Sequence, residues 1–266
     1  MAELGADVAA TTASTGVTEN RAARALFVGA CFLYWMALYL YVPTLSTYAE
    51  SRIPDNRDSF TIRYGNSYVE DPEGRILNKQ EAVKTSANKP ATKTLLQEKN
   101  IPTPELISFE DVIAGNVKFP VIVRRNNHFK GKFFNMCNNS RDVRRFNPSN
   151  HYIQEMVTKK DEYRLFVLND RIIEANIKRC PENRPTPMIR NKENGCFFAR
   201  VRVSDLDRNL KNAARSAIRE IGLDFGAVDC ATIQEYPGIT IFEVNSAPGL
   251  IPRKIELLKT KLEEII

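Results

Sequence analysis

Short apolar runs separated by polar and turn residues recur in the second half of the chain, and they predict β-strands. These runs occupy residues 121–123, 152–157, 163–178, 228–235 and 239–245. The turn signal Asn169-Asp170 divides residues 163–178 into two strands, and Pro237-Gly238 separates the last two runs. Both pairs are therefore predicted to be antiparallel hairpins.

Three other stretches place apolar residues at helical spacing. Asn88 is the predicted N-cap of a helix that ends before Pro102. A second helix follows a capping box that ends at Asp207, with Gly222 as its C-cap, and a third begins near Ile251. The apolar faces of the last two helices are Leu206, Leu210, Ala214, Ala217 and Ile221, and Ile255, Leu258, Leu262 and Ile265. From residue 51 onward the chain is therefore predicted to be a packed domain of mixed helices and strands.

Residues 25–49 break this pattern, because they contain no charged residue and no polar stripe. A run of this length spans a bilayer at about 1.5 Å per residue, so it is a predicted transmembrane helix. The alternative is a helix buried in a protein core. Arginines both precede and follow the run, so the positive charges give no orientation. Residues 1–24 are predicted to be a disordered leader.

The stretch YLYVPTLSTYA at residues 39–49 resembles the first membrane helix of a major-facilitator transporter. Nothing later in the chain repeats it. The chain is therefore interpreted either as a membrane-anchored enzyme or as a join of two unrelated pieces, one of them a transporter fragment.

Composition narrows the chemistry. The net charge of +6 and the pI near 9.0 fit an anionic ligand such as a nucleotide, and equally fit a solvated basic surface. Five scattered cysteines and two histidines, without a C-x-x-C pair, argue against zinc and for reduced cytosolic thiols. The basic segments lack interleaved aromatic residues, so no specific nucleic-acid partner is expected.

Polar residues interrupt the last hairpin in a way that indicates a metal site. Glu243 and Asn245 are two residues apart on one strand and share a face, and folding about the turn places Asp229 opposite them. Three oxygen donors among apolar strands are costly without a cation, and magnesium prefers such donors together with substrate phosphates. The alternative is an exposed hairpin with scattered polar residues.

The same hairpin, with Asp229 followed by FEVNSAPGL, resembles the C-terminal signature of ATP-grasp carboxylate-amine ligases. This superfamily includes D-alanine:D-alanine ligase and the ribosomal-protein glutamate ligase. Four earlier segments stand in the order that the family has: SANKPATKTLLQEKNIPTPE, FPVIVRR, YIQEMV and EYRLFVLNDRIIEANIKR. The segment IRYGNS, which precedes them, is similar to a segment of the phage-type amino-ligase branch. The resemblance covers Thr61 to Leu250. It implies an α+β, ATP-grasp fold, with residues 50–86 as a truncated pre-grasp part and 87–266 as the ATP-grasp domain.

The resemblance also implies roles for individual residues. It assigns adenine and ribose to Glu155, Met156, Val157 and Glu162. It assigns the nucleotide phosphates to Arg124 and to the loop residues Lys130, Gly131 and Lys132. It places Arg164, Lys178 and Arg179 at the substrate carboxylate and the developing phosphoryl charge. It assigns Asp229, Glu243 and Asn245 to two magnesium ions, with Glu243 bridging them.

The implied function is ATP-dependent activation of a carboxylate as an acyl phosphate, followed by attack of an amine. The cofactors are then ATP and Mg²⁺, and the partners are small-molecule or peptide carboxylates and amines. The expected location is a cytoplasmic catalytic domain, with a membrane contact only through residues 25–49. Two departures stand against the family pattern: Arg124 replaces a common lysine, and the first domain is short. An ATP-binding module without ligase activity is the alternative from another functional class.

Overall fold

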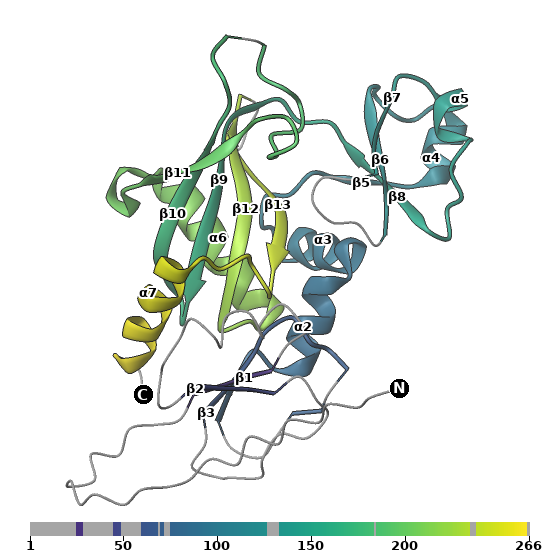
Figure 1. Cartoon of the computed structure of the whole chain (residues 1–266). Helices are drawn as coiled ribbons and strands as arrows, with labels where there is room; N and C mark the ends of the chain where they lie inside the picture. The colour runs from purple at the N-terminus through teal and green to yellow at the C-terminus, as the bar shows by residue number, and fades with distance from the viewer. Residues whose placement is uncertain are drawn as a thin grey trace, which may run out of the picture.

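The computed structural model of the chain describes residues 25–28, 45–48, 60–68, 70–71, 75–126, 133–183, 185–234 and 238–264. These residues form three β-sheets with helices packed against them. The largest sheet lies in the centre, a smaller lobe lies beside it, and a parallel sheet lies below (Figure 1).

The lower sheet is parallel and has the order β2-β1-β3-β4. Its strands are β1 (Ala25–Val28), β2 (Leu45–Tyr48), β3 (Phe60–Arg63) and β4 (Arg75–Leu77). The prediction of an apolar helix over 25–49 is therefore wrong at both ends of that run, and residues 29–44 lie outside the described residues. Buried parallel strands are nearly continuous apolar runs, so the absence of charge did not distinguish them from a helix.

This finding bears directly on the predicted membrane anchor. No helix within the described ranges combines the length and the apolar character that crossing a bilayer requires. Strands β1 and β2 pair in the same parallel sheet as β3 and β4. The predicted leader at 1–24 lies outside the described residues.

The smaller lobe is an antiparallel sheet of order β5-β8-β6-β7 with two short helices on one face. Its strands are β5 (Leu106–Ile107), β6 (Val121–Arg125), β7 (Phe134–Cys137) and β8 (His151–Glu155). The helices are α4 (Phe109–Ala114) and α5 (Ser140–Val143). The hydrophobic core of this lobe contains Val112, Val121, Val123, Cys137, Val143 and Ile153.

The central sheet is antiparallel and has the order β11-β10-β9-β12-β13. Its strands are β9 (Lys159–Leu168), β10 (Arg171–Arg179), β11 (Phe197–Val201), β12 (Phe225–Ile233) and β13 (Ile239–Asn245). The 3₁₀ turn η1 (Val203–Asp205) leads from β11 to the long helix α6 (Arg208–Ile221). Alternation along these strands gives the sheet two faces with different roles.

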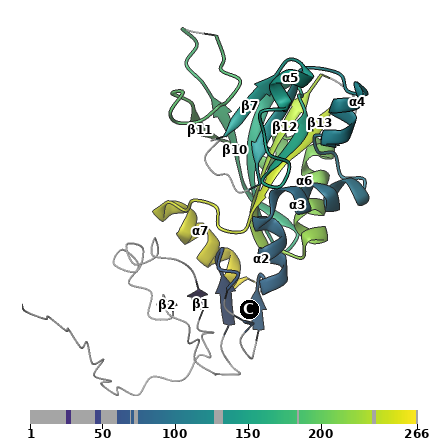
Figure 2. The same ribbon diagram turned by 90° about the vertical axis from the view of Figure 1, so that its right-hand side faces the viewer.

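Helices cover one face of the central sheet completely and the other face only in part. The helices α2 (Gln80–Ala87), α3 (Lys89–Glu98) and α6 pack on the first face through the main hydrophobic core. The helix α7 (Pro252–Glu263) covers the lower end of the second face, where Phe166, Leu168 and Leu258 are buried (Figure 2). The upper part of the second face is left for polar side chains.

Several predictions of local structure are confirmed. The Asn88 side chain accepts a hydrogen bond from Ala91 N at the start of α3. The predicted capping box of Ser204 and Asp207 is wrong, because Asp207 is itself the N-cap of α6 and accepts from Leu210 N, whereas Ser204 lies in the preceding turn η1. Gly222 ends α6 in the left-handed region, with φ +84°. Asn169 and Asp170 form the turn between β9 and β10, both at positive φ.

The cysteine prediction is wrong in one respect, because Cys180 and Cys196 form a disulfide. The register explains it: Arg179 pairs with Phe197, so the two cysteines flank the last pair of the β10–β11 ladder, with their Cα atoms 4.1 Å apart. A separation of 16 residues in the chain did not reveal this pairing. Cys137 and Cys230 are buried free thiols.

Loss of this disulfide is expected to lower the free energy of unfolding by about 3 kcal/mol, because closing a loop of this length restricts the unfolded chain. The measurement is guanidinium unfolding with and without dithiothreitol. The double variant Cys180→Ser/Cys196→Ser is the control and should unfold at the same midpoint in both conditions. A wild-type midpoint that is insensitive to the reductant would contradict the bridge.

Candidate functional site

The predicted metal hairpin forms with the predicted register. Asp229 on β12 pairs directly with Glu243 on β13, and Ala227 pairs with Asn245. The amide of Asn245 donates to Asp229 Oδ2 over 3.3 Å, so the three oxygen-bearing side chains meet on one face. Gly226 permits this approach, since a Cβ there would lie 2.9 Å from the carbonyl oxygen of Asn245.

A half-buried arginine holds the first of these carboxylates. Arg164 on β9 pairs with Asp229 in the register and donates from Nε and Nη2 to its two oxygens, over 2.7 and 2.6 Å. Burial of Asp229, which is only 6% exposed, favours the neutral acid, but Arg164 outweighs it and lowers the pKa below the ordinary value. Asp229 is therefore a carboxylate whose charge is already compensated.

A lysine holds the second carboxylate, and the sequence interpretation missed it. Lys89 Nζ lies 2.7 Å from Glu243 Oε1 and 3.4 Å from the carbonyl oxygen of Val244. Lys89 is the first residue of α3, so the turn between α2 and α3 brings it to the end of β13. Its position next to the N-cap Asn88 in NKPATK placed Lys89 at the start of a helix from the sequence alone. Only the fold shows that its side chain reaches β13.

Lys93, one turn further along α3, was also missed. Its side chain is 3% exposed, and its ammonium lies 3.3 Å from Thr103 Oγ1. Burial lowers the pKa of Lys93 from 10.5 to about 7, and the positive charge of Arg124 also lowers it. The negative charges of Glu243 and Glu155 raise this pKa, but by less. The cleft between the two lobes thus contains more cationic groups than the sequence had indicated.

This pKa makes the free energy of unfolding depend on pH. Lys93 titrates near 10.5 in the unfolded chain and near 7 in the folded one, so between these values the unfolded chain binds the extra proton. Stability should therefore rise with pH across this window. In urea unfolding, Lys93→Met should be more stable than wild type at pH 7, by a margin that shrinks at pH 9. A margin that stays constant would contradict the shifted pKa.

A second ionic cluster lies beside Arg164 on the same face. Glu162 on β9 is buried between Lys178 of β10, which forms a short ion pair with Oε1, and Lys159, whose Nζ lies 2.7 Å from Oε2. Burial lowers the pKa of Lys159, although Glu162 acts against that effect. The ring of Phe198 on β11 lies over both Arg164 and Lys178. Glu162 therefore has two cations as partners.

A cavity of about 620 Å³ lies where the two lobes meet. Glu155, Met156, Val157 and Thr158, which connect β8 to β9, line one side, and Phe119, Pro120, Ile101 and Ile239 line others. The Glu155 carboxylate accepts a hydrogen bond from the backbone nitrogen of Glu105 at 3.0 Å, which ties β8 to the segment that enters β5. A cavity with apolar and polar walls, beside the backbone that follows β8, suits a planar heterocycle.

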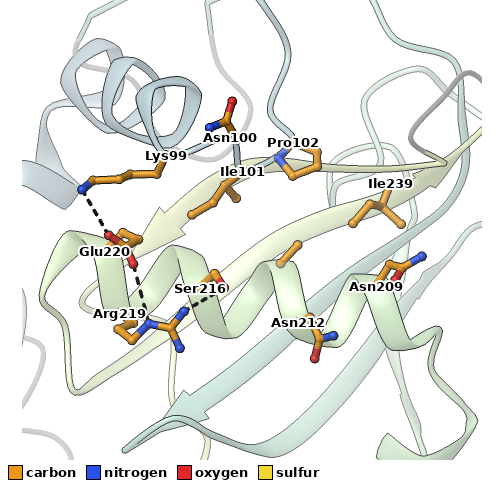
Figure 3. A pocket seen from close by; sticks show the side chains of 11 residues that line it. Lys99, Asn100, Ile101, Pro102, Asn209, Asn212, Ser216, Arg219, Glu220 and Ile239 are labelled. Atoms are coloured by element: carbon orange, nitrogen blue, oxygen red, sulfur yellow. Dashed lines mark hydrogen bonds and ion pairs between the residues drawn. The ribbon is translucent and has the colours of Figure 1, made fainter.

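A second cavity, of about 500 Å³, lies behind this one and contains none of the predicted site residues. It runs between the end of α3 and the outer side of α6, where Lys99, Glu220 and Arg219 form a chain of ion pairs (Figure 3). Its remaining rim is made of Asn100, Asn209, Asn212 and Ser216. We assign the chemistry to the first cavity, because the carboxylates and their cations lie on that side.

Residues 83–264 match the family described as the RimK-like ATP-grasp domain. The chain belongs to this family. A comparison with curated proteins gives no sequence match.

Solved structures agree on the fold of this RimK-like domain. The D-alanine–D-alanine ligase from Bacillus anthracis is 13% identical with a TM-score of 0.62, over 91% of this chain and 97% of that one. The ATP-grasp ligase PsnB, in complex with a minimal precursor, is 14% identical with a TM-score of 0.59, over 88% and 93% of the two chains. Carboxyaminoimidazole ribonucleotide synthase from Aspergillus clavatus is 13% identical with a TM-score of 0.57, over 84% and 70%. Identities this low show the ATP-grasp fold alone.

The RimK-like fold separates two residues that the sequence interpretation grouped. Arg179 pairs with Phe197, whereas Lys178 pairs with Phe198, so Arg179 lies on the opposite face of the sheet from Lys178 and Arg164. Alternation along a strand makes this unavoidable for consecutive residues. Arg179 lies instead near Tyr163, on the side where α6 packs.

The remaining predicted residues divide between the lobe and an undescribed loop. Arg124 lies near the end of β6, with its guanidinium 5.9 Å from the ring of Phe134 and its charge acting on Lys93. Its predicted role at the phosphates stays a prediction. Lys130, Gly131 and Lys132 lie outside the described residues.

The donor set fits magnesium better than a soft metal. No group of three or more His, Cys, Asp or Glu side chains that could hold a metal occurs in the described part of the chain. Asp229, Glu243 and Asn245 instead offer two carboxylates and an amide, which leaves positions for water and phosphate oxygens. Both carboxylates have cationic partners, Arg164 for Asp229 and Lys89 for Glu243.

Proposed function

We propose that the chain is an ATP-dependent ligase that joins a carboxylate to an amine. The observation that carries this proposal is the pairing of Asp229 with Glu243 on one face of the hairpin, with Arg164 and Lys89 as their counter-ions. The buried Asp229 and the partly exposed Glu243, each paired with a cation, offer oxygen donors on one face of the sheet. Membership of the RimK-like ATP-grasp family supports the same reaction class.

We assign the nucleotide to the cavity between the lobes. In this assignment Glu155 and the backbone at Met156 and Val157, which line the cavity, hold adenine, and Glu162 binds the ribose. Arg124 and the loop of Lys130, Gly131 and Lys132 contact the phosphates. Asp229, Glu243 and Asn245 would hold Mg²⁺, as two ions, and the metal would neutralise charge on the transferring phosphoryl group. The PsnB ligase has been solved with Mg and ADP, and the Bacillus anthracis ligase with ATP.

The chain's own cations then perform the rest of the chemistry. A carboxylate oxygen of the substrate attacks the γ-phosphorus, the bond to the β,γ-bridging oxygen breaks, and ADP leaves. Arg164 and Lys178 hold the carboxylate and stabilise the charge on the acyl phosphate. The amine attacks the acyl carbon, loses a proton, and inorganic phosphate leaves. Arg179 is omitted from this set because it lies on the other face.

The phage-type branch and the domain limits are also proposals. The IRYGNS segment supports the branch: the Tyr64 hydroxyl donates a short hydrogen bond to the carbonyl oxygen of Pro248, in the turn after Asn245. Gly65, at φ +70°, comes so close to Ala247 that a Cβ would lie 2.6 Å from that side chain. We propose 87–266 as the ATP-grasp domain, preceded by a pre-grasp sheet that includes β1 and β2.

The test is ADP formation by the full chain with MgATP, pooled amino acids as carboxylates, and hydroxylamine as the amine. We expect ADP release that depends on the carboxylate, together with a hydroxamate product. Nucleotide binding without ADP from any acid would contradict the ligase and favour a binding module. The described residues give no support to a transporter fragment.

A further inference from the structure

An exposed aromatic residue lies over the two cations that the proposed reaction uses. Phe198 is 41% exposed, although its ring centroid lies 5.0 Å from Arg164 Cζ and 5.6 Å from Lys178 Nζ. An exposed ring beside two cations offers apolar surface next to positive charge. Its exposed area is therefore available to a ligand.

The strand that carries Phe198 is the edge of the central sheet. β11 pairs only with β10 in the described structure, and it lies at the outer side of the sheet in Figure 1. The disulfide Cys180–Cys196 fastens this edge to β10 directly before Phe197. The ring therefore stands on a fixed element and not on a free loop.

The groups around Phe198 combine positive charge with apolar surface. Arg200, two residues along on the same face, is exposed and forms no ion pair with any described residue. Met188, 40% exposed, accepts a hydrogen bond from Lys159 through its carbonyl oxygen over 2.8 Å. Lys159 and Lys178 both pair with Glu162, so Met188 joins the ionic cluster through its backbone.

We propose that Phe198 is a specificity-determining residue that selects carboxylic acids with an aromatic or large apolar group beside the carboxylate. The carboxylate oxygens bind Arg164 and Lys178, and the apolar group covers the exposed part of the Phe198 ring. Contact between two aromatic rings, together with the apolar area removed from water, gives a preference of about tenfold over a small acid. This assignment rests on the proposed function of the site and names its substrate class.

The neighbouring phenylalanine supplies a matched control. Phe197 is on the same edge strand and is 60% exposed, but it pairs with Arg179 and lies on the opposite face. Phe197→Ala therefore removes a similar ring from the same strand without touching the site. Phe198→Leu is a milder second variant that keeps apolar volume and removes the ring.

The experiment measures equilibrium binding by titration calorimetry of two probes, N-acetylphenylalanine and N-acetylalanine, to the full chain with MgADP present. Wild type and Phe197→Ala should bind the aromatic acid about tenfold more tightly, Phe198→Ala should bind both equally, and Phe198→Leu should lie between them. Circular dichroism checks that each variant is folded. Equal affinity for the two acids in wild type, undetectable binding of both, or a preference that survives Phe198→Ala would overturn the proposal.

The same samples distinguish this proposal from the ligase assignment. ADP formation with MgATP, hydroxylamine and each acid measures the ligase reaction. The ratio of the two affinities from calorimetry measures the selectivity that Phe198 is proposed to give. Selective binding without ADP would contradict the ligase and retain Phe198 as a selector. If both acids gave ADP equally well and bound with equal affinity, the ligase assignment would stand and the proposed role of Phe198 in selectivity would be contradicted.

Discussion

Replacing Glu243 with glutamine is expected to reduce ATP turnover by at least about 1000-fold while the chain remains folded. The amide keeps the shape of the side chain but removes the charge that the phosphate-bound cations require. Lys89 loses its partner at 2.7 Å, yet it stays partly exposed to water, so the free energy of unfolding should change little. Carboxylate-dependent ADP release measures the turnover.

Glu220→Gln is the control for this variant. Glu220 also pairs with a lysine, Lys99 at 3.6 Å, but it lies on the outer side of α6, away from the cleft. Its replacement should leave ADP release within about twofold of wild type. Turnover by Glu243→Gln within tenfold of wild type would remove Glu243 from the proposed metal site.

Replacing Arg164 with methionine is expected to lower both stability and activity. Asp229 is 6% exposed and would lose both hydrogen bonds to the guanidinium, and an uncompensated buried charge costs about 3 kcal/mol or more in the free energy of unfolding. Turnover should fall by at least about 100-fold, because the same cation stabilises the transferred phosphoryl charge. Urea unfolding at pH 7 and ADP release measure the two effects.

The double variant Arg164→Met/Asp229→Asn separates the two effects. Removing the carboxylate charge should restore most of the lost free energy of unfolding, since no unpaired charge then remains in the sheet. It should not restore turnover, because Asp229 is itself proposed to bind magnesium. Losses of stability that simply add would show that Arg164 and Asp229 do not interact as the geometry indicates.

The hairpins and the grouping of Asp229, Glu243 and Asn245 could be predicted from the sequence because their signals are local. Alternation along β13 places Glu243 and Asn245 on one face. The direct pairing of Asp229 with Glu243 also needs a register shift between Asp229 and Cys230, which the turn signal alone does not give. The rule of alternation, applied to β10, would have separated Lys178 from Arg179, since consecutive residues cannot share a face. That error came from transferring a motif as a block without checking its strand geometry.

Other features depended on contacts between distant segments. Lys89 reaches Glu243 only because α2 and α3 turn back against β13, and Cys180 meets Cys196 only because β10 and β11 pair up to their ends. The apolar run at 25–49 misled for a different reason. Uninterrupted apolar residues suit a buried parallel strand as well as a membrane helix, and periodicity cannot distinguish them.

The transfer of an oxygen atom from the carboxylate to phosphate tests acyl-phosphate chemistry most directly. The full chain would be supplied with MgATP, hydroxylamine and a pool of amino acids labelled with ¹⁸O in the carboxylate, and the inorganic phosphate would be analysed by mass spectrometry. We expect one ¹⁸O in each phosphate released, because the attacking carboxylate oxygen leaves with the phosphorus. Unlabelled phosphate, or AMP in place of ADP, would contradict the proposed ligase mechanism.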